Sequence, residues 1–106
     1  MKAQRLEREF ARRNVRPGHP SLLLDGDDAL ALVDRAAEEG VPILGLDGFL
    51  VADADVQPLL EHSVDFSRFV AAGHGGWQQA AAFINDRRDR VSAFGITLGS
   101  DPVEAV

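Results

Sequence analysis

Two aspartates set two positions apart, Asp25 and Asp27, are the first candidates for chemistry in this chain of 106 residues. They follow a short apolar run, and enzymes that transfer phosphoryl groups through an aspartate place such a pair at the end of a strand. That chemistry also needs a threonine or serine directly behind the pair, whereas Asp28 and Ala29 follow here. A helix N-cap at Asp25, with acidic side chains in the first helical turn, explains the aspartates without catalysis.

A glycine-rich loop at 73–76 is the second candidate. Its His-Gly-Gly run resembles the oxyanion loops of lipases, but the sequence contains no G-x-S-x-G nucleophile motif. The loop precedes a predicted helix, and a helix N-terminus can hold an anion. A small enzyme or ligand-binding protein that uses this loop is therefore kept as an alternative.

The three histidines, His19, His62 and His74, do not have the spacing of metal ligands. None lies three or four residues from another histidine or an acid on a predicted helix. The chain has no cysteine, which excludes disulfides and thiolate ligands. We therefore expect no metal, no cofactor and no catalytic residue.

Charge is distributed unevenly along the chain. Residues 1–16 carry six basic and two acidic side chains, whereas the remainder carries five basic and fifteen acidic ones. Such an acidic body repels nucleic acid and attracts basic protein surfaces, although acidity can also serve solubility alone. No apolar run approaches the ~20 residues that span a bilayer, and no signal-peptide core follows the basic start. We expect a cytoplasmic protein with no membrane or nucleic-acid partner.

A helix followed at once by a strand forms the centre of the predicted fold. Residues 26–39 have a helical apolar pattern that begins after Asp25 and stops at Gly40. The next segment, 43–51, is apolar on both alternating faces, with Ile43 on the same face as Asp47. This pattern predicts an interior strand that is covered on each side.

The remaining elements complete a small domain. Residues 77–88 predict a second helix and 91–98 a strand, and 22–24 are either a brief edge strand or an apolar staple before the next helix. Residues 59–72 are expected to be mostly loop with a short helical turn. The fold class is α/β or α+β, with a sheet of about three to four strands and two main helices packed on it. The expected core residues are Leu30, Val33, Leu44, Leu46, Phe49, Trp77, Ile84, Phe94 and Ile96.

Three parts of different character follow from these assignments. Residues 1–19 form a basic arm that could contain a short, loosely docked helix, because its apolar stripe is narrow. Residues 20–99 form the globular domain, and 100–106 a polar tail.

The order of these elements resembles the immunity protein 40 family of bacterial polymorphic toxin systems. In that family a helix runs into an Ile-Leu-Gly-Gly-Asp-aromatic strand, and a later helix carries a Ser-x-x-x-Ala-x-x-aromatic-Ile motif. Here Leu46 replaces the second glycine and Gly48 intervenes before the aromatic. The resemblance covers residues 28–98 and implies tight binding of one cognate toxin domain, without catalysis. The residues that approximate the two motifs are Gly45, Asp47, Phe49, Ala80, Phe83 and Ile84.

Acidic side chains in the middle of the chain are the predicted contacts with such a partner. If the toxin is a basic nuclease, carboxylates could occupy positions that phosphates take in its active site. Loops carry much of the specificity in proteins, and an aspartate in an apolar strand or a lone tryptophan can also mark a binding surface. A regulatory or structural interaction module with no toxin partner is the main alternative. The predicted partner-binding residues are Asp47, Asp53, Asp55, Glu61, Asp65 and Trp77.

Overall fold

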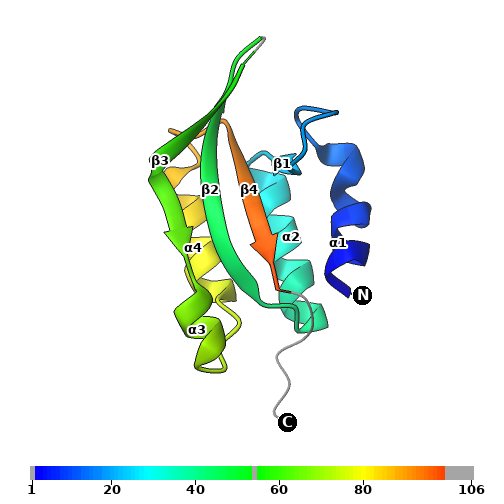
Figure 1. Ribbon diagram of the computed structural model, residues 1–106, viewed down its shortest axis with the longest axis vertical. Coiled ribbons are helices and arrows are strands. Elements are labelled where there is room, and N and C mark those ends of the chain that lie inside the picture. The colour runs from blue at the N-terminus through cyan, green and yellow to red at the C-terminus, as the bar shows by residue number, and fades with distance from the viewer. Residues whose placement is uncertain (1, 54, 100–106) are drawn as a thin grey trace.

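A four-stranded antiparallel sheet with helices on one face forms the domain (Figure 1). The computed structural model describes residues 2–53 and 55–99. The strand order is β1-β4-β2-β3, where the strands span Leu23–Leu24 (β1), Ile43–Val51 (β2), Val56–Asp65 (β3) and Ala93–Leu98 (β4). The expected fold class is confirmed in its α+β form, since every pairing is antiparallel.

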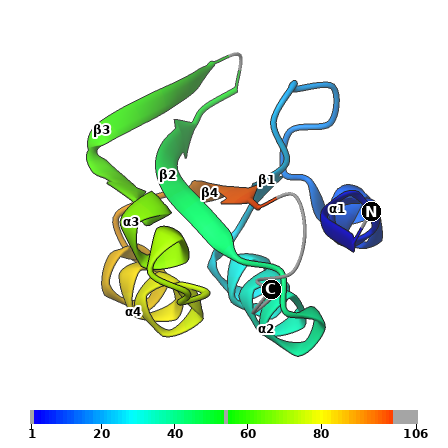
Figure 2. The ribbon, with the colours of Figure 1, turned by 60° about the horizontal axis from the view of Figure 1, so that its bottom comes forward.

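The two longest helices form a second layer on one side of the sheet (Figure 2). Helices α2 (Gly26–Glu39) and α4 (Trp77–Arg87) pack against each other and against the strands, and α1 (Lys2–Phe10) lies beside α2. A turn of 3₁₀ helix at Ala11–Arg13 follows α1, and the short α3 (Ser67–Ala71) follows β3. No helix within 2–53 or 55–99 is long and apolar enough to cross a membrane.

Local signals set the ends of α2 where the sequence predicts them. The Asp25 carboxylate accepts a hydrogen bond of 2.8 Å from the Asp28 backbone N–H, as an N-cap does. Gly40 ends the helix with φ 73°, a left-handed conformation that glycine adopts without a steric penalty. The turn that follows directs the chain straight into β2.

A bulge in β2 changes which residues face the helices. Ile43 pairs with Leu98 and Gly45 with Thr97, so Leu44 is an extra residue between two successive pairs. Ile43 and Leu46 therefore point the same way and are both fully buried, at 0% exposure. The prediction that Ile43 shares a face with Asp47 was wrong, because strict alternation does not survive a bulge.

The prediction that β2 is covered on each side was also wrong. The strand is interior, between β4 and β3, as expected. However, the helices cover only one face, and Asp47 on the opposite face is exposed. An antiparallel sheet tolerates one solvated face, whereas the two apolar faces in the sequence pattern are typical of a strand buried on both.

Residues 59–72 were expected to be mostly loop with a short helical turn. The helical turn is confirmed by α3, but the loop was wrong, because residues 59–65 belong to strand β3. Asp47 pairs with Ser63 but Gly48 pairs with Leu59, so residues 60–62 bulge out of the ladder and hide the strand periodicity. The bulge lies close to β2, as shown by the 2.9 Å that would separate a Cβ added at Gly48 from the His62 Cβ. Glycine in β2 thus permits the close approach of the neighbouring strand.

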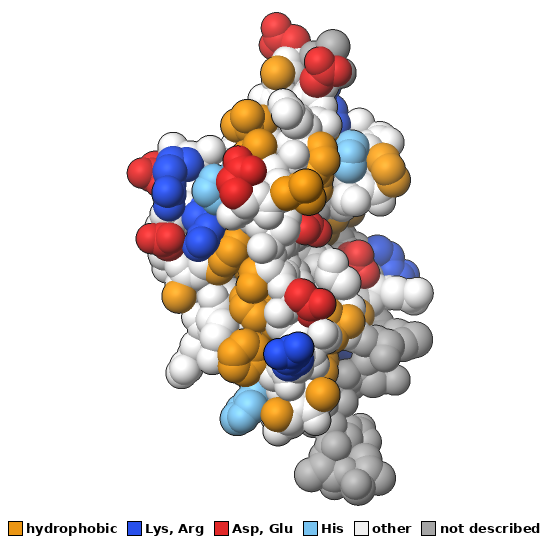
Figure 3. Space-filling model, turned by 60° about the vertical axis from the view of Figure 1, so that its left-hand side comes forward, with side chains coloured by type: hydrophobic (Ala, Val, Ile, Leu, Met, Phe, Trp, Pro, Cys, Tyr) orange, Lys and Arg blue, Asp and Glu red, His pale blue; other side chains and the backbone are white. Residues whose placement is uncertain are grey.

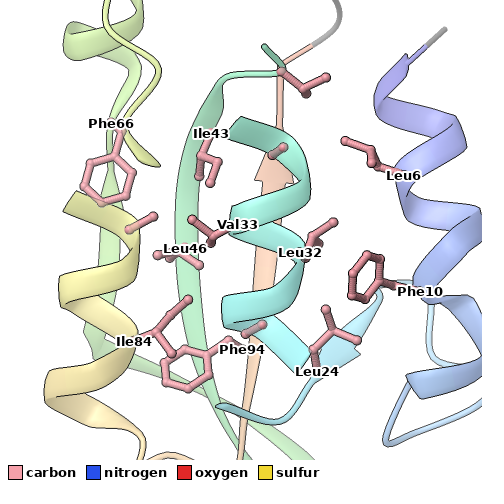
Figure 4. Packing of buried hydrophobic residues seen from close by; sticks show 14 of the residues in the cluster. Leu6, Phe10, Leu24, Leu32, Val33, Ile43, Leu46, Phe66, Ile84 and Phe94 are labelled. Carbon is pink, nitrogen blue, oxygen red and sulfur yellow. The ribbon is translucent and has the colours of Figure 1, made fainter. Parts of the chain in front are cut away.

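The core lies between the sheet and the helices (Figure 4). Of the predicted core residues, Leu44 and Phe49 lie outside this cluster, because the bulge and the open face place them elsewhere. Helix α1 belongs to the cluster, since Leu6 and Phe10 are 1% and 4% exposed. Its narrow stripe is therefore enough to dock the helix on α2, and the expectation of loose docking was wrong. The predicted polar tail at 100–106 lies outside the described residues. Large side chains buried in the cluster include Leu6, Phe10, Leu24, Leu32, Val33, Ile43, Leu46, Phe66, Ile84 and Phe94.

Candidate partner-binding surface

Five of the six predicted contact residues lie on one hairpin, formed by β2 and β3. Residues 43–65 contain five acidic side chains and no lysine or arginine. Figure 3 shows acidic side chains spread along this side of the molecule, with hydrophobic ones between them. The acids are Asp47 in β2, Asp53 and Asp55 at the hairpin turn, Glu61 in the β3 bulge and Asp65 at the end of β3.

None of these five carboxylates forms an ion pair with a lysine or arginine within the described part of the chain. The helices differ in this respect. Arg35 pairs with Glu9 at 2.9 Å, and Arg13 pairs with Asp28 at 3.2 Å. Within the described residues, much of the helix charge is thus paired internally, whereas the hairpin acids form no ion pair.

Asp65 is held by the start of α3. The Ser67 backbone N–H donates to its carboxylate at 2.7 Å. Hydrogen bonds from the Ser67 hydroxyl and backbone, together with the charge of Arg68, lower the pKa of Asp65 below its ordinary value. The hydrogen bond from Ser67 thus fixes the orientation of a carboxylate that favours its charged form.

Arg16 orients the turn of the hairpin, although sequence analysis gave it no such role. Its guanidinium donates to the carbonyl oxygen of Asp53 at 2.9 Å and to those of Ala52 and Asp55. These bonds use backbone oxygens, and the carboxylates of Asp53 and Asp55 form no ion pair within residues 2–53 and 55–99. The sequence around Arg16 does not predict this contact, because the carbonyl groups that it bonds lie 36 to 39 residues further along the chain.

The outer edge of β3 is poorly suited to adding a further strand. Ala52 and Asp55 exchange both backbone hydrogen bonds. In an antiparallel ladder such bonded pairs alternate with pairs that exchange none, so the pair of Phe49 and Pro58 is not bonded and the nitrogen of Pro58 points away from β2. Proline has no N–H to offer there, and the bulge at 60–62 interrupts the edge again. A partner would thus be recognised by side chains of the hairpin and of the open sheet face.

Asp47 lies at the centre of the open face. It pairs with Gly95 on β4 and with Ser63 on β3, and its side chain is exposed. A groove of about 320 Å³ opens beside it, lined also by Glu7 of α1 and by Phe49. Asp47 therefore lies on a shaped surface, whereas Asp53 and Asp55 lie at an exposed turn.

Trp77 is the one predicted contact residue that the structure does not bring to the hairpin. It begins α4 in the helix layer, and its indole N–H donates to the Val41 carbonyl oxygen at 2.7 Å. The half-buried ring packs against the core cluster. The geometry accounts for Trp77 as a link between α4 and the chain segment that enters β2.

The loop at 73–76, the basis of the enzyme alternative, has a structural explanation. The Gly75 carbonyl accepts from the Ile43 backbone N–H at 2.8 Å, and a Cβ at Gly75 would overlap the Trp77 ring. Gly76 has φ 78°, where a larger residue would be strained. Within 2–53 and 55–99, no three His, Cys, Asp or Glu side chains are placed to hold a metal ion.

Comparison with known proteins adds no family assignment. No protein-family model matches the chain, and no curated protein sequence matches it.

Proposed function

We propose that this protein binds another protein through its acidic β2–β3 hairpin, and that the partner is a toxin domain which it neutralises without catalysis. The observation that carries the proposal is the set of five carboxylates on one hairpin that contains no lysine or arginine. The resemblance to the immunity protein 40 family supports the toxin as the specific partner. We also propose that the protein acts in the cytoplasm, where it would meet a toxin that acts in the same compartment.

The energetics favour a basic partner surface. The hairpin acids share one sign of charge and therefore repel one another. A cationic surface relieves this repulsion and is attracted over a distance of about a Debye length, ~8–10 Å near physiological salt. Such complementarity raises the association rate more than the intrinsic affinity. Occupation of a nuclease's cationic site by these carboxylates would exclude its substrate.

The test combines capture of the partner with charge reversal. The protein is used to isolate its native partner from the source cell, and association is followed by stopped flow at low salt. We expect the variant with Asp53, Asp55, Glu61 and Asp65 all changed to Lys to associate roughly 10-fold or more slowly, because steering is lost. The variant should also fail to protect cells that express the captured toxin.

A matched control carries the same change of net charge on the helix layer, with Asp34, Glu38, Asp86 and Asp89 changed to Lys. These four side chains are exposed. The control should retain most of the association rate, and both variants should keep the circular dichroism spectrum of the native fold. Equal slowing in the two variants would show that overall charge, not the hairpin, steers the partner. A captured partner without toxic activity would favour the regulatory or structural module instead.

A further inference from the structure

A groove on the open sheet face lies next to the acidic hairpin. Its floor is formed by β2 and β4, and one wall is formed by α1 together with the segment that precedes β1. It encloses about 320 Å³ and includes Glu7, Ser21, Asp47, Phe49, Gly95 and Thr97. This volume lies at the low end of ligand-binding sites and is suited to a single side chain rather than to a large ligand.

An aromatic ring forms part of the floor and is held in place by its neighbours. A Cβ at Gly95 would lie 3.1 Å from Cε1 of Phe49, so the ring lies directly over the glycine of the adjacent strand. The His19 ring meets Phe49 in an edge arrangement, with ring centroids 6.3 Å apart. Phe49 is only half-buried, and part of its surface is therefore open to the groove.

Two carboxylates line the same groove without an ion-pair partner among the described residues. They are Glu7 and Asp47. Glu9 lies two positions further along α1 and points about 200° away around the helix, where it pairs with Arg35. The two glutamates of α1 thus have different surroundings, and only Glu7 is directed to the groove.

We propose that this groove receives an arginine side chain of the partner. This inference rests on the proposed function, and it names the chemistry of the residue that anchors the complex. A planar guanidinium can stack on Phe49 while donating charge-assisted hydrogen bonds to Asp47 and Glu7. A second copy of the chain is disfavoured as the occupant, because its net charge of −6 would repel this acidic surface.

The experiment uses small probes, so it does not depend on the partner. The ¹⁵N-labelled full chain is titrated with N-acetyl-arginine amide, and the backbone amides of Gly95 and Thr97 are followed by NMR. N-acetyl-citrulline amide is the matched control, because it keeps the shape of arginine and lacks the charge. We expect saturable shifts at Gly95 and Thr97 with the arginine probe and none with the citrulline probe.

Two matched variants locate the site. The double variant Glu7→Gln, Asp47→Asn should weaken binding of the arginine probe at least about 10-fold. The double variant Asp34→Asn, Asp89→Asn removes the same number of charges from exposed positions outside the groove lining and should bind the probe as the native chain does. Native shift dispersion in both variants shows that the fold is intact.

Several outcomes would overturn the inference. These are no saturable shift, equal shifts with citrulline, equal binding of N-acetyl-lysine amide, or loss of binding in the Asp34→Asn, Asp89→Asn variant. The proposed function fails separately, if no protein partner is captured even though the arginine probe binds. If the partner is captured and dissociates from the Glu7→Gln, Asp47→Asn variant at the native rate, the groove inference fails and the proposed function remains.

Discussion

Asp25, Asp47 and Asp65 show how the surroundings of one residue type determine its contribution. Asp25 caps α2 and accepts a backbone hydrogen bond, and Asp65 is held by Ser67 at the start of α3. Asp47 has neither a capping bond nor an ion pair within the described residues, although it lies in an interior strand. Local structure thus accounts for Asp25, fixes the orientation of Asp65 while its side chain stays exposed, and gives Asp47 no such partner.

Removal of the α2 cap should destabilise the fold. We expect Asp25→Ala to lower the free energy of unfolding by about 0.5–2 kcal/mol, because an N-terminal backbone N–H loses its acceptor. Urea unfolding followed by circular dichroism measures the change. Asp34→Ala, at an exposed site inside the same helix, should stay within about 0.5 kcal/mol of the native value. Equal losses in both variants would contradict a capping role.

The pKa of Asp65 should respond to its serine neighbour. The folded-state pKa is lowered, so the contribution to stability is complete above the unfolded pKa of about 3.9 and is lost as pH falls through the folded value. Ser67→Ala removes the hydroxyl donor and should raise the pKa of Asp65 in part, because the backbone donor stays. A carboxyl NMR titration measures this shift. Glu9, whose pKa is lowered by its bond to Arg35, should not move.

At the scale of elements, the β2–β3 hairpin depends on a contact from outside it. Arg16 lies in the connection between the 3₁₀ turn and β1, and it donates to three carbonyl oxygens of the hairpin turn. The acidic turn is therefore oriented by the N-terminal part of the chain. This contact links the basic N-terminal segment to the surface that we propose for binding.

We expect Arg16→Ala to loosen the turn without unfolding the domain. Hydrogen exchange at the amides of Ala52 and Asp55, which bond to each other across the turn, should become faster. The amides of Leu46 and Phe94 in the core strands should keep their protection. Arg12→Ala, at an exposed position on the 3₁₀ turn, is the control and should leave the exchange at the turn unchanged.

Helix α1 should contribute to the stability of the whole domain. Leu6 is 1% exposed in the core cluster, so Leu6→Ala should lower the free energy of unfolding by about 2–5 kcal/mol. Phe49→Ala should cost less than Leu6→Ala, because Phe49 is half-buried on the open face. Chemical denaturation of both variants tests this order. A smaller loss for Leu6→Ala would mean that α1 docks only loosely.

At the scale of the whole molecule, charge and fold divide the protein into two sides. The helix layer carries ion pairs such as Arg35–Glu9 and Arg13–Asp28, whereas the hairpin carries acids alone. One face of the sheet is filled by the core, and the other is open. Among the described residues, the five hairpin acids thus lack ion-pair partners and lie beside the open face of the sheet.

This arrangement predicts a characteristic dependence on salt. The association rate with the captured partner should fall steeply as salt rises from about 0.1 M to 1 M, because the Debye length shrinks from ~10 Å to ~3 Å. The dissociation rate should change much less, since close contacts are screened weakly. Stopped-flow association and dissociation at several salt concentrations measure both rates. An association rate independent of salt would contradict steering by the hairpin.

Local signals in the sequence were sufficient for several elements. The ends of α2 follow from Asp25 and Gly40, because an N-cap and a left-handed glycine act over a few residues. The interior position of β2 and the segments of α4 and β4 were predicted from apolar periodicity. The acidic character of residues 43–65 is likewise a property of composition alone.

Only the tertiary structure decided how these parts meet. The bulges at Leu44 and at 60–62 depend on strand register, which is set by contacts between distant residues. Because the bulge at 60–62 breaks the alternation of side chains, the sequence pattern did not reveal β3. The docking of α1 and the contact of Arg16 with the hairpin are also long-range. Which face of the sheet stays open, and which carboxylates stay unpaired, follow from this packing. The residues that carry charge could thus be read from the sequence, but the surface they form could not.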